Sequence, residues 1–369
     1  MSGARRHSSR RPKRRDAAAS AWRVADGFMN RLRAIPRAGE WWEYKLLPIL
    51  AVFYGTALHL GVSLTSLWPA ALIFLGAVVP GAAYVSIVND LADRDEDAAA
   101  GKPNRMAGRP AWQAVLLVAL PGSAGLAFAW HWRGDAPLLL AYLAAWTAFS
   151  LYSLPPVRLK ARGLAGVLAD ASGAHLFPSL LAALLVFRHA GVAPGALWLT
   201  AVALWAASYG VRGILWHQLA DLDADRLAGV RTFAQRRGPA MLALLARWLV
   251  FPLEIAGLAV LLWLVASPLP LLALAFYLFL VQRRVAVWEM RAVLVQPRPR
   301  YLILMVDYYD VLLPLALLAA AAVAHPLDIA VIAVHLLLFP KRASTVFHDA
   351  WRLRRGYLPR RPRPWRQNR

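Results

Sequence analysis

Long apolar runs recur along the chain and limit what it can fold into. Ten such runs follow one another, separated by short loops, and the last is the shortest. They cover residues of about 46–66, 68–90, 111–130, 136–153, 164–187, 194–217, 240–265, 267–282, 302–323 and 326–340. About 20 apolar residues in a helix cross the roughly 30 Å hydrocarbon core of a bilayer. With 59% hydrophobic residues, the sequence therefore predicts an all-α polytopic transmembrane bundle of nine to ten spans.

The basic residues predict how this bundle is oriented. If the N-terminus lies in the cytoplasm and the runs alternate, nearly all of the 42 Lys and Arg residues fall on the cytoplasmic side. Arg133 and Arg188 then lie on the opposite side, and Arg212 and Arg247 lie within spans. Cytoplasmic loops of membrane proteins carry an excess of Lys and Arg. We therefore expect a multi-pass protein of the cell (inner) membrane with both termini cytoplasmic.

Both ends of the chain are basic, and the formal net charge is +22. The pattern predicts a basic N-terminal arm over 1–45 with a candidate interfacial helix at 20–38, a transmembrane domain over 46–340, and a basic C-terminal tail over 341–369. Basic runs beside membrane spans attract anionic headgroups by about 1 kcal/mol per residue. We therefore expect anionic lipids, and no nucleic acid, at the termini. The chain has no cysteine, which excludes disulfides and thiolate metal sites.

Acidic residues gather in two clusters, each placed where an apolar run meets a basic loop. The first cluster contains Asn89, Asp90, Asp93 and Asp97, and the second contains Asp221 and Asp225. If the helix of the second run continues past Asn89, its three carboxylates share one face, and the i, i+4 pair of the second cluster does the same. Carboxylates this close repel one another unless a cation neutralises them, and Mg²⁺ accepts such ligands together with phosphate oxygens. The sequence therefore predicts a magnesium site at the cytoplasmic face.

Basic residues accompany both clusters. Lys102 and Arg105 follow the first, Arg158 and Lys160 lie in the loop after the fourth run, and further arginines follow the second. Lys and Arg bind phosphate oxygens through charge-assisted hydrogen bonds. Carboxylates for a metal beside cations for phosphate indicate a diphosphate site.

Other classes of protein could also carry such clusters. Asp221, Asp223 and Asp225 match the start of an EF-hand loop, but Arg226 and Thr232 stand where that loop needs Gly and Glu. An ion-coupled secondary transporter is an alternative, because two similar motifs in two halves suggest an internal repeat. Transporter sites usually lie near the bilayer midplane, however, whereas these clusters lie at helix ends. A membrane scaffold that recruits partners through its basic termini would leave both acidic clusters unexplained.

Three segments resemble the motifs of the UbiA-type membrane prenyltransferases. Residues 89–97 resemble the family's N-D-x-x-D-x-x-x-D motif, and residues 221–232 resemble its second motif, D-x-x-x-D-x-x-x-G-x-x-T. Between them, residues 152–160 are similar to the family's Y-S-x-P-P-x-x-x-K loop. The three segments occur in the family's order, and the resemblance covers roughly residues 40–325.

The resemblance implies a helical bundle around a central cavity that opens at the cytoplasmic face. It implies a Mg²⁺-dependent prenyltransferase, with a polyprenyl diphosphate as donor and a hydrophobic acceptor that is most often aromatic. A lipid headgroup or a sugar phosphate as acceptor is the alternative. Carried over by position, the metal-binding and catalytic residues are Asp90, Asp93, Asp97, Asp221 and Asp225. The diphosphate-binding residues are Asn89, Lys102, Arg105, Arg158 and Lys160.

The chain departs from the family at two points. The family generally has nine spans, and ten runs are present here. Many relatives carry an Arg-Thr pair after the first motif, whereas this chain has Gly-Lys-Pro-Asn-Arg at 101–105. The roles of Lys102 and Arg105 therefore depend on charge and position alone.

Three further residues are candidates for the acceptor side of the cavity. Tyr152 and His217 lie close to the motifs, and the face of an aromatic ring can stabilise an allyl cation. Arg212 lies about two turns before the second motif, and charged residues inside spans are usually functional. We expect it either to contact the acceptor or diphosphate, or to form a buried ion pair with a carboxylate such as Asp170.

Overall fold

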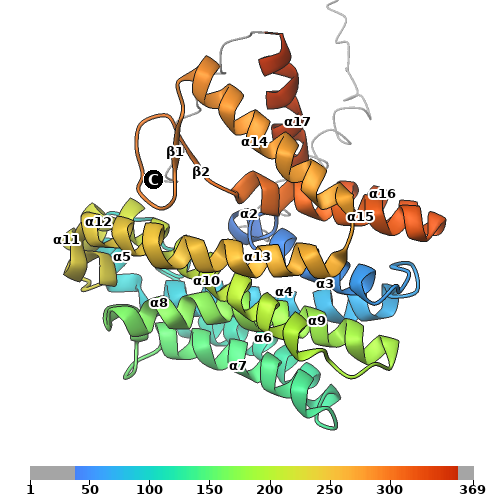
Figure 1. Ribbon diagram of the computed structural model, residues 1–369. Helices are drawn as coiled ribbons and strands as arrows, with labels where there is room; N and C mark the ends of the chain where they lie inside the picture. The colour runs from blue at the N-terminus through green and yellow to red at the C-terminus, as the bar shows by residue number, and fades with distance from the viewer. Residues whose placement is uncertain (1–37, 356–369) are drawn as a thin grey trace, which may run out of the picture.

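The computed structural model describes residues 38–355. The candidate interfacial helix at 20–38, apart from its last residue, lies outside the described residues, as do the arginines of the N-terminal arm and the end of the basic tail. The described part is mostly helical and is shown in Figure 1.

Seven helices in the described part are long and apolar enough to cross a membrane, or eight if one bent pair is counted as a span. They are α4 (Trp68–Ala92), α6 (Ala111–His131), α7 (Ala136–Ser153), the segment Leu164–Ala190, α10 (Ala196–Ala220), the segment Phe233–Val265, which is kinked at Gly238 (φ 75°), and α14 (Pro268–Trp288). The predicted nine to ten spans exceed this number. The difference comes from two shorter apolar helices, Leu46–His59 and Tyr308–Ala324, and from the bent pair at the C-terminal end.

The remaining elements are short or lie within these segments. They are α2 (Ala38–Trp41), α3 (Leu46–His59), α5 (Arg94–Ala99), η1 (Leu159–Ala161), α8 (Leu164–Ala171), η2 (Ser172–Leu176), α9 (Phe177–Ala190), α11 (Leu222–Leu227), α12 (Phe233–Leu245), η3 (Ala246–Val250) and α13 (Phe251–Val265). The C-terminal elements are β1 (Arg291–Val293), β2 (Tyr301–Ile303), η4 (Tyr308–Leu312), α15 (Leu313–Ala324), η5 (Pro326–Asp328), α16 (Ile329–Leu338) and α17 (Pro340–Arg354).

Three apolar segments contain a π-helical turn, and in each case a proline follows the turn. The turns η2, η3 and η4 lead into α-helices whose second residues are Pro178, Pro252 and Pro314. Proline lacks an amide hydrogen and its ring collides with the carbonyl four residues earlier in an α-helix. A wider π turn relieves this collision without ending the helix. The prolines in these runs therefore reshape the helices rather than break them.

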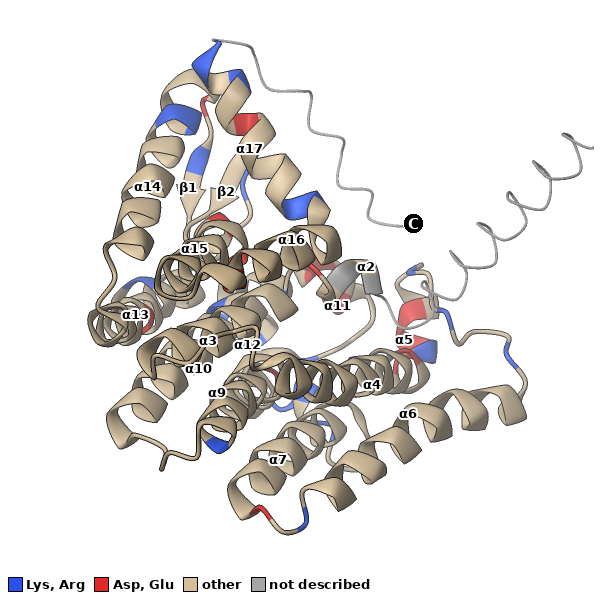
Figure 2. Ribbon diagram, turned by 90° about the vertical axis from the view of Figure 1, so that its right-hand side faces the viewer, with Lys and Arg blue, Asp and Glu red and all other residues tan. Residues whose placement is uncertain are grey.

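The bundle is held together by close packing of α10 against α13 and α8, and of α3 against α9 and α15. At Gly257 of α13, an added Cβ would lie 2.7 Å from the backbone nitrogen of Trp205, so only glycine allows α13 and α10 to approach this closely. Figure 2 shows that the long helices carry very few charged residues and that charge collects at their ends. Large apolar side chains such as Leu120 and Trp263 point outward, as expected for a surface that faces lipid.

The C-terminal region differs most from the sequence-based prediction. Residues 302–305 are not helical, because Tyr301–Ile303 forms β2, which pairs in parallel with β1, and a turn follows at 304–305. This two-stranded ladder interrupts a chain that is otherwise mostly helical, as predicted. The predicted tenth span, 326–340, ends at a bend of 92° between the helical segments Pro326–Leu338 and Pro340–Arg354. The bend falls at Phe339 (φ −130°, ψ 56°), since a residue that precedes proline disfavours the helical conformation.

The first part of the predicted basic tail belongs to the folded structure. Residues 340–354 form α17, which packs against α14 (Figure 1). Arg342 of α17 donates to Asp307 (2.7 Å) and Asp310 (2.9 Å), and Arg284 of α14 pairs with Asp307 and with Asp349 of α17 (3.0 Å). This ionic network fixes α17 to the end of α14.

Candidate active site

The two acidic motifs have the same backbone geometry. In the first motif, Asp93 (φ −106°, ψ 7°) separates the end of α4 from the six-residue helix α5. In the second motif, Asp221 (φ −94°, ψ 6°) separates the end of α10 from the six-residue helix α11. Each short helix is followed by a glycine with positive φ, Gly101 at 65° and Gly229 at 70°. Glycine adopts this left-handed conformation without steric strain. The expectation that Asp90, Asp93 and Asp97 share one continuous helix is therefore wrong, and the motif is a turn that occurs twice.

Cations surround the carboxylate of Asp93. It accepts hydrogen bonds from Lys160 Nζ and from Arg158 Nη2, the latter at 3.0 Å. The same two cations bind Glu96, with Arg158 Nη1 at 2.6 Å and Lys160 Nζ at 3.1 Å. Burial raises the pKa of Glu96, but the hydrogen bonds and charges of Arg158 and Lys160 outweigh it and hold the pKa below the usual value. Glu96 was not among the predicted site residues; its position inside the first acidic motif was the only signal for it.

A close contact between η1 and α8 fixes the position of Lys160. A Cβ added at Gly166 would lie 2.5 Å from the carbonyl oxygen of Leu159 and 2.9 Å from Cα of Lys160. Arg158 itself adopts a left-handed conformation at φ 39°. The glycine on α8 therefore lets the loop lie flat on the helix, and the loop in turn directs Lys160 onto the first motif.

The other residues of the first motif bind the loop that follows it. Asn104 Nδ2 donates to the carbonyl oxygen of Asp90 and to Oδ2 of Asp97, both at 2.7 Å. Arg105 Nη1 lies 3.7 Å from Oδ2 of Asp90, which is almost fully buried. Asn89 accepts a hydrogen bond of 3.3 Å from Ser153 Oγ at the end of α7. Sequence reasoning did not select Asn104, and nothing but its place in the basic loop distinguishes it.

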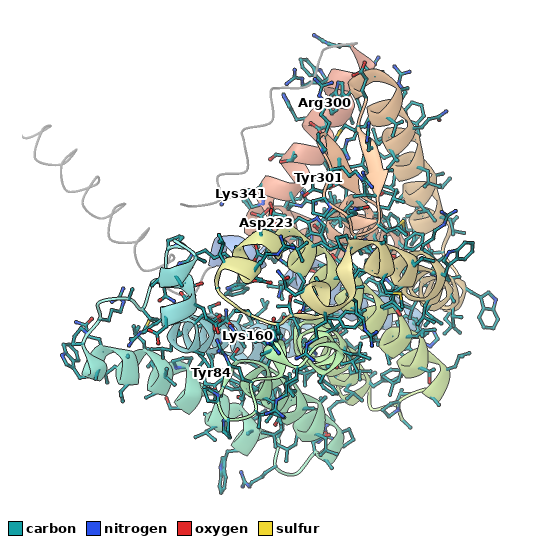
Figure 3. The ribbon with its side chains drawn as sticks, turned by 90° about the vertical axis from the view of Figure 1, so that its left-hand side faces the viewer. Tyr84, Lys160, Asp223, Arg300, Tyr301 and Lys341 are labelled. Carbon is teal, nitrogen blue, oxygen red and sulfur yellow. The ribbon has the colours of Figure 1, made fainter. Side chains whose placement is uncertain are left out.

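One ion pair joins the two motifs. Lys102 Nζ, from the loop after α5, lies 3.2 Å from Oδ2 of Asp221. Burial and the nearby charge of Asp221 raise the pKa of Asp225 to about 6. Tyr152, at the end of α7, lies within electrostatic reach of Asp93, Asp221 and Asp225. Figure 3 labels Lys160 and, on α11, Asp223. The structure thus brings the predicted carboxylates and cations together at one end of the bundle.

The donor set suits a hard divalent cation. Carboxylate oxygens are present in both motifs, and the raised pKa of Asp225 reflects two carboxylates close together in a partly buried place. Within residues 38–355, however, no three acidic or histidine side chains converge on one point as a ready-made metal site. Mg²⁺ usually binds through one or two carboxylates and completes its octahedron with water and substrate phosphates. The residues therefore fit Mg²⁺ bound together with a diphosphate better than Mg²⁺ bound by protein alone.

Arg212 forms a buried ion pair, but not with Asp170. Its Nε and Nη2 bind the two carboxylate oxygens of Glu254 on α13 at 2.6 and 2.8 Å, and Tyr309 donates to Oε1 at 2.9 Å. Both partners are almost fully buried. The observed contact is the ion pair that ties α10 to α13, and the expected partner is corrected to Glu254. The signal for it was a single Glu inside an apolar run.

His217 is exposed at the end of α10, and its ring lies 4.9 Å from that of Trp216. Tyr152 and His217 remain predictions for the acceptor side.

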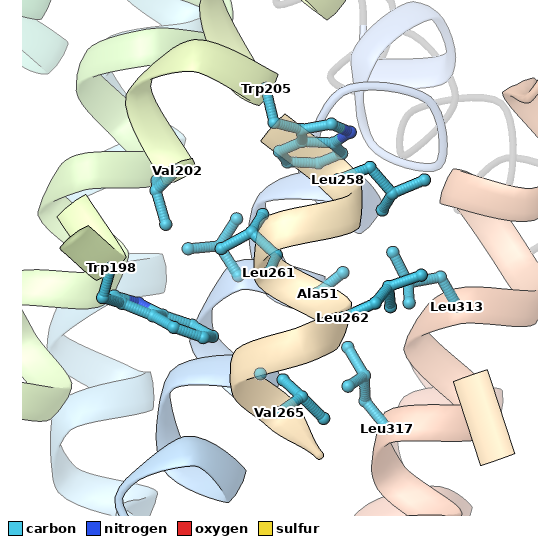
Figure 4. Close-up of a pocket in the computed structure, with 12 residues that line it drawn as sticks. Ala51, Trp198, Val202, Trp205, Leu258, Leu261, Leu262, Val265, Leu313 and Leu317 are labelled. Atoms are coloured by element: carbon cyan, nitrogen blue, oxygen red, sulfur yellow. The ribbon is translucent and has the colours of Figure 1, made fainter. Parts of the chain in front are cut away.

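An apolar pocket lies deeper in the bundle, between α3, α10, α13 and α15 (Figure 4). Trp198 and Trp205 of α10, Leu258 of α13 and Leu313 of α15 line it. Its volume of about 30 Å³ is close to that of one water molecule. Sixteen residues of α10 separate Trp205 from Asp221, or about 24 Å along the helix. The pocket is therefore separate from the acidic motifs.

Comparisons with known proteins identify the family. The model of the UbiA prenyltransferase family matches residues 46–295. A lycopene elongase/hydratase from Halobacterium salinarum is 31% identical over 211 residues, which cover 54% of this chain and 68% of that protein. The fold is similar to a UbiA homolog from Archaeoglobus fulgidus bound to GPP and Mg²⁺, with a TM-score of 0.53 and 19% identity over 80% of this chain and 99% of that one. The structure of an A. fulgidus UbiA homolog bound to DMAPP and Mg²⁺ matches with a TM-score of 0.50 and 18% identity over 79% of this chain and 98% of that one. The chain therefore belongs to the UbiA prenyltransferase family, and it is a multi-pass membrane prenyltransferase.

Proposed function

We propose that this protein transfers a prenyl group from an allylic polyprenyl diphosphate to a hydrophobic acceptor in a Mg²⁺-dependent reaction. The observation that carries the proposal is the ion pair between Lys102 and Asp221, which joins two acidic turns of similar backbone geometry. Lys160 and Arg158 add two cations beside the first turn. A diphosphate that bridges the two turns would meet carboxylates for its metal ions and cations for its free oxygens.

The chain's own residues have separate roles in this proposal. Asp90, Asp93 and Asp97 would hold metal on one side and Asp221 and Asp225 on the other. When bound, Mg²⁺ stabilises the negative charge that develops on the leaving diphosphate.

In the structure, Lys160 pairs with Asp93 and Lys102 pairs with Asp221. Once these carboxylates bind metal, both ammonium groups can turn to the diphosphate oxygens. Asn89 would assist the first turn, while Arg105 and Arg158 would add positive charge around the diphosphate.

Transfer also requires that the allyl cation be kept from water. The apolar helices around the motifs exclude water, and the ring of Tyr152 near both turns can stabilise positive charge by cation–π attraction. The acceptor is predicted to be aromatic. The relative described as a lycopene elongase/hydratase supports a second candidate, an extended hydrocarbon acceptor. We further propose that the motif face is cytoplasmic, that the protein lies in the cell (inner) membrane, and that its basic termini bind anionic lipids.

Donor binding tests the proposal directly. Purified protein in detergent would be titrated with labelled allylic diphosphates of several chain lengths in Mg²⁺ or EDTA. We expect Mg²⁺-dependent binding that is lost in Asp93→Ala and Asp221→Ala. Asp223→Ala is the matched control, because this acidic residue lies in the same turn but its side chain is 94% exposed. Binding unaffected by EDTA and by both substitutions would reject the diphosphate site and favour the transporter.

Turnover then identifies the acceptor. The same protein would be supplied with an aromatic acid, a quinone precursor, a long polyene, a lipid headgroup and a sugar phosphate. Product from the polyene alone would favour the extended hydrocarbon, and product from a ring compound would support the aromatic prediction.

A further inference from the structure

A second cavity opens at the end of the bundle opposite the acidic motifs. It has a volume of about 370 Å³ and lies where α4 begins, α6 ends, α7 begins and α9 ends. Twenty residues of α4 separate Ala70, which lines this cavity, from Asp90 of the first motif. At 1.5 Å per residue this separation is about 30 Å. The cavity is therefore distinct from the proposed diphosphate site.

Ionisable side chains form part of the cavity lining. Arg188, His189 and His131 line it, together with one carboxylate, that of Asp135. Arg188 Nε lies 3.2 Å from Oδ2 of Asp135, and the Arg188 side chain is 73% exposed. A guanidinium carries five N–H donors, so this ion pair leaves donors for a further anion. Asp135 also caps α7, because its Oδ1 accepts from the amide of Leu138 at 3.3 Å, so only its Oδ2 faces Arg188.

Apolar side chains form the rest of the lining. Leu138 and Leu185 are buried and line it. On the outer surface nearby, Trp68 and Trp130 are exposed by 64% and 68%. Exposed Trp residues at helix ends are typical of the boundary between hydrocarbon and water. A molecule that fills the cavity would meet the guanidinium of Arg188, two imidazoles and apolar side chains.

We propose that this cavity binds the phosphate headgroup of an anionic phospholipid from the leaflet on this face. Arg188 would bind the phosphate, since guanidinium matches phosphate geometry, and His131 and His189 would donate from their rings. One acyl chain would lie along Leu138 and Leu185. Basic pockets between transmembrane helices bind anionic headgroups in this way. The site also accounts for a basic residue on the face where loop Lys and Arg are scarce.

Lipid binding by the full chain in detergent tests the proposal, with native mass spectrometry as the readout. Phosphatidylglycerol should bind more tightly than phosphatidylcholine. Arg188→Ala should weaken phosphatidylglycerol about tenfold, the loss of one charge-assisted hydrogen bond. Asp135→Asn should strengthen it, because the competing charge is removed while an oxygen remains to cap α7. Arg133→Ala is the matched control: Arg133 lies on the same face but packs over Trp130, 4.1 Å from the ring centroid, and should bind as wild type does.

Three further measurements separate the explanations. Thermal unfolding of each variant shows that it is folded. Asp93→Ala should bind phosphatidylglycerol like wild type, so that failure of the diphosphate site would not affect this result. Inorganic phosphate should displace the lipid only weakly, because it lacks the acyl chain. Equal phosphatidylglycerol affinity in wild type, Arg188→Ala and Asp135→Asn would overturn the proposal, and so would full displacement by an equal concentration of inorganic phosphate.

Discussion

Replacing Gly166 by alanine should impair catalysis by moving Lys160. The new Cβ would lie 2.5 Å from the carbonyl oxygen of Leu159, whereas ordinary contacts begin near 3.4 Å. The obstacle is backbone, so η1 must move away from α8 by about 0.9 Å. A misplacement of about 1 Å in an active site can lower the rate by about 10²-fold. Since Lys160 holds Asp93, we expect kcat/KM for the prenyl diphosphate to fall about 100-fold in Gly166→Ala.

The assay compares this variant with two other glycine substitutions. Initial rates with labelled donor and a saturating acceptor would be measured beside thermal unfolding of each protein. Gly122→Ala has open space around its Cβ and should behave like wild type. Gly257→Ala is as tightly packed but remote from the motifs, so it should lose about 1–3 kcal/mol of stability with a small change in rate. If Gly166→Ala lost no more activity than Gly257→Ala, the positional argument would be refuted.

Three other perturbations test separate parts of the structure. Arg212→Ala or Glu254→Ala should each destabilise the protein by about 3–5 kcal/mol, because a buried charge loses its partner. The double variant Arg212→Met with Glu254→Leu should recover most of this stability, as measured by unfolding in detergent. Single variants as stable as wild type would contradict the buried pair. In the folded protein the pKa of Asp225 is about 6, above the ordinary 3.8. Metal-free protein should therefore lose stability as pH rises from 3.8 to about 6. Mg²⁺ should bind more tightly as pH rises through about 6, because the carboxylate that binds it is then ionised. Melting curves with and without Mg²⁺ from pH 4 to 8 would show both trends, and their persistence in Asp225→Asn would assign them to another group. Lys102→Ala should raise KM for the donor about tenfold. The variant should lose little stability, because the ion pair between Lys102 and Asp221 is partly exposed. An unchanged KM would contradict the link between the motifs.

The sequence allowed several features of the active site to be predicted. Asp93 and Asp221 were selected by spacing and by the basic loops that follow them, and both lie in the observed turns. Lys102 and Lys160 were selected by charge and position, and both bind a motif carboxylate. These predictions depend on segments of about ten residues, in which the charged side chains and the residues that form the turn are neighbours in the sequence. Glu96 was overlooked because the acidic motif was reduced to its regularly spaced members.

The apolar runs by themselves determined that the chain is a helical membrane protein, since only helices satisfy their own backbone in lipid within a single segment. The motif order determined the family to which it belongs. Tertiary structure alone decided that Arg212 pairs with Glu254, that Gly166 fixes the position of Lys160, and that residues 340–354 form a helix bound to α14. Each of these contacts joins segments that are separate in the chain or depends on a close approach of two backbones. Local sequence encodes the solvent that a helix prefers and the turn that ends it, but the partner of a buried charge is set by which helices pack together.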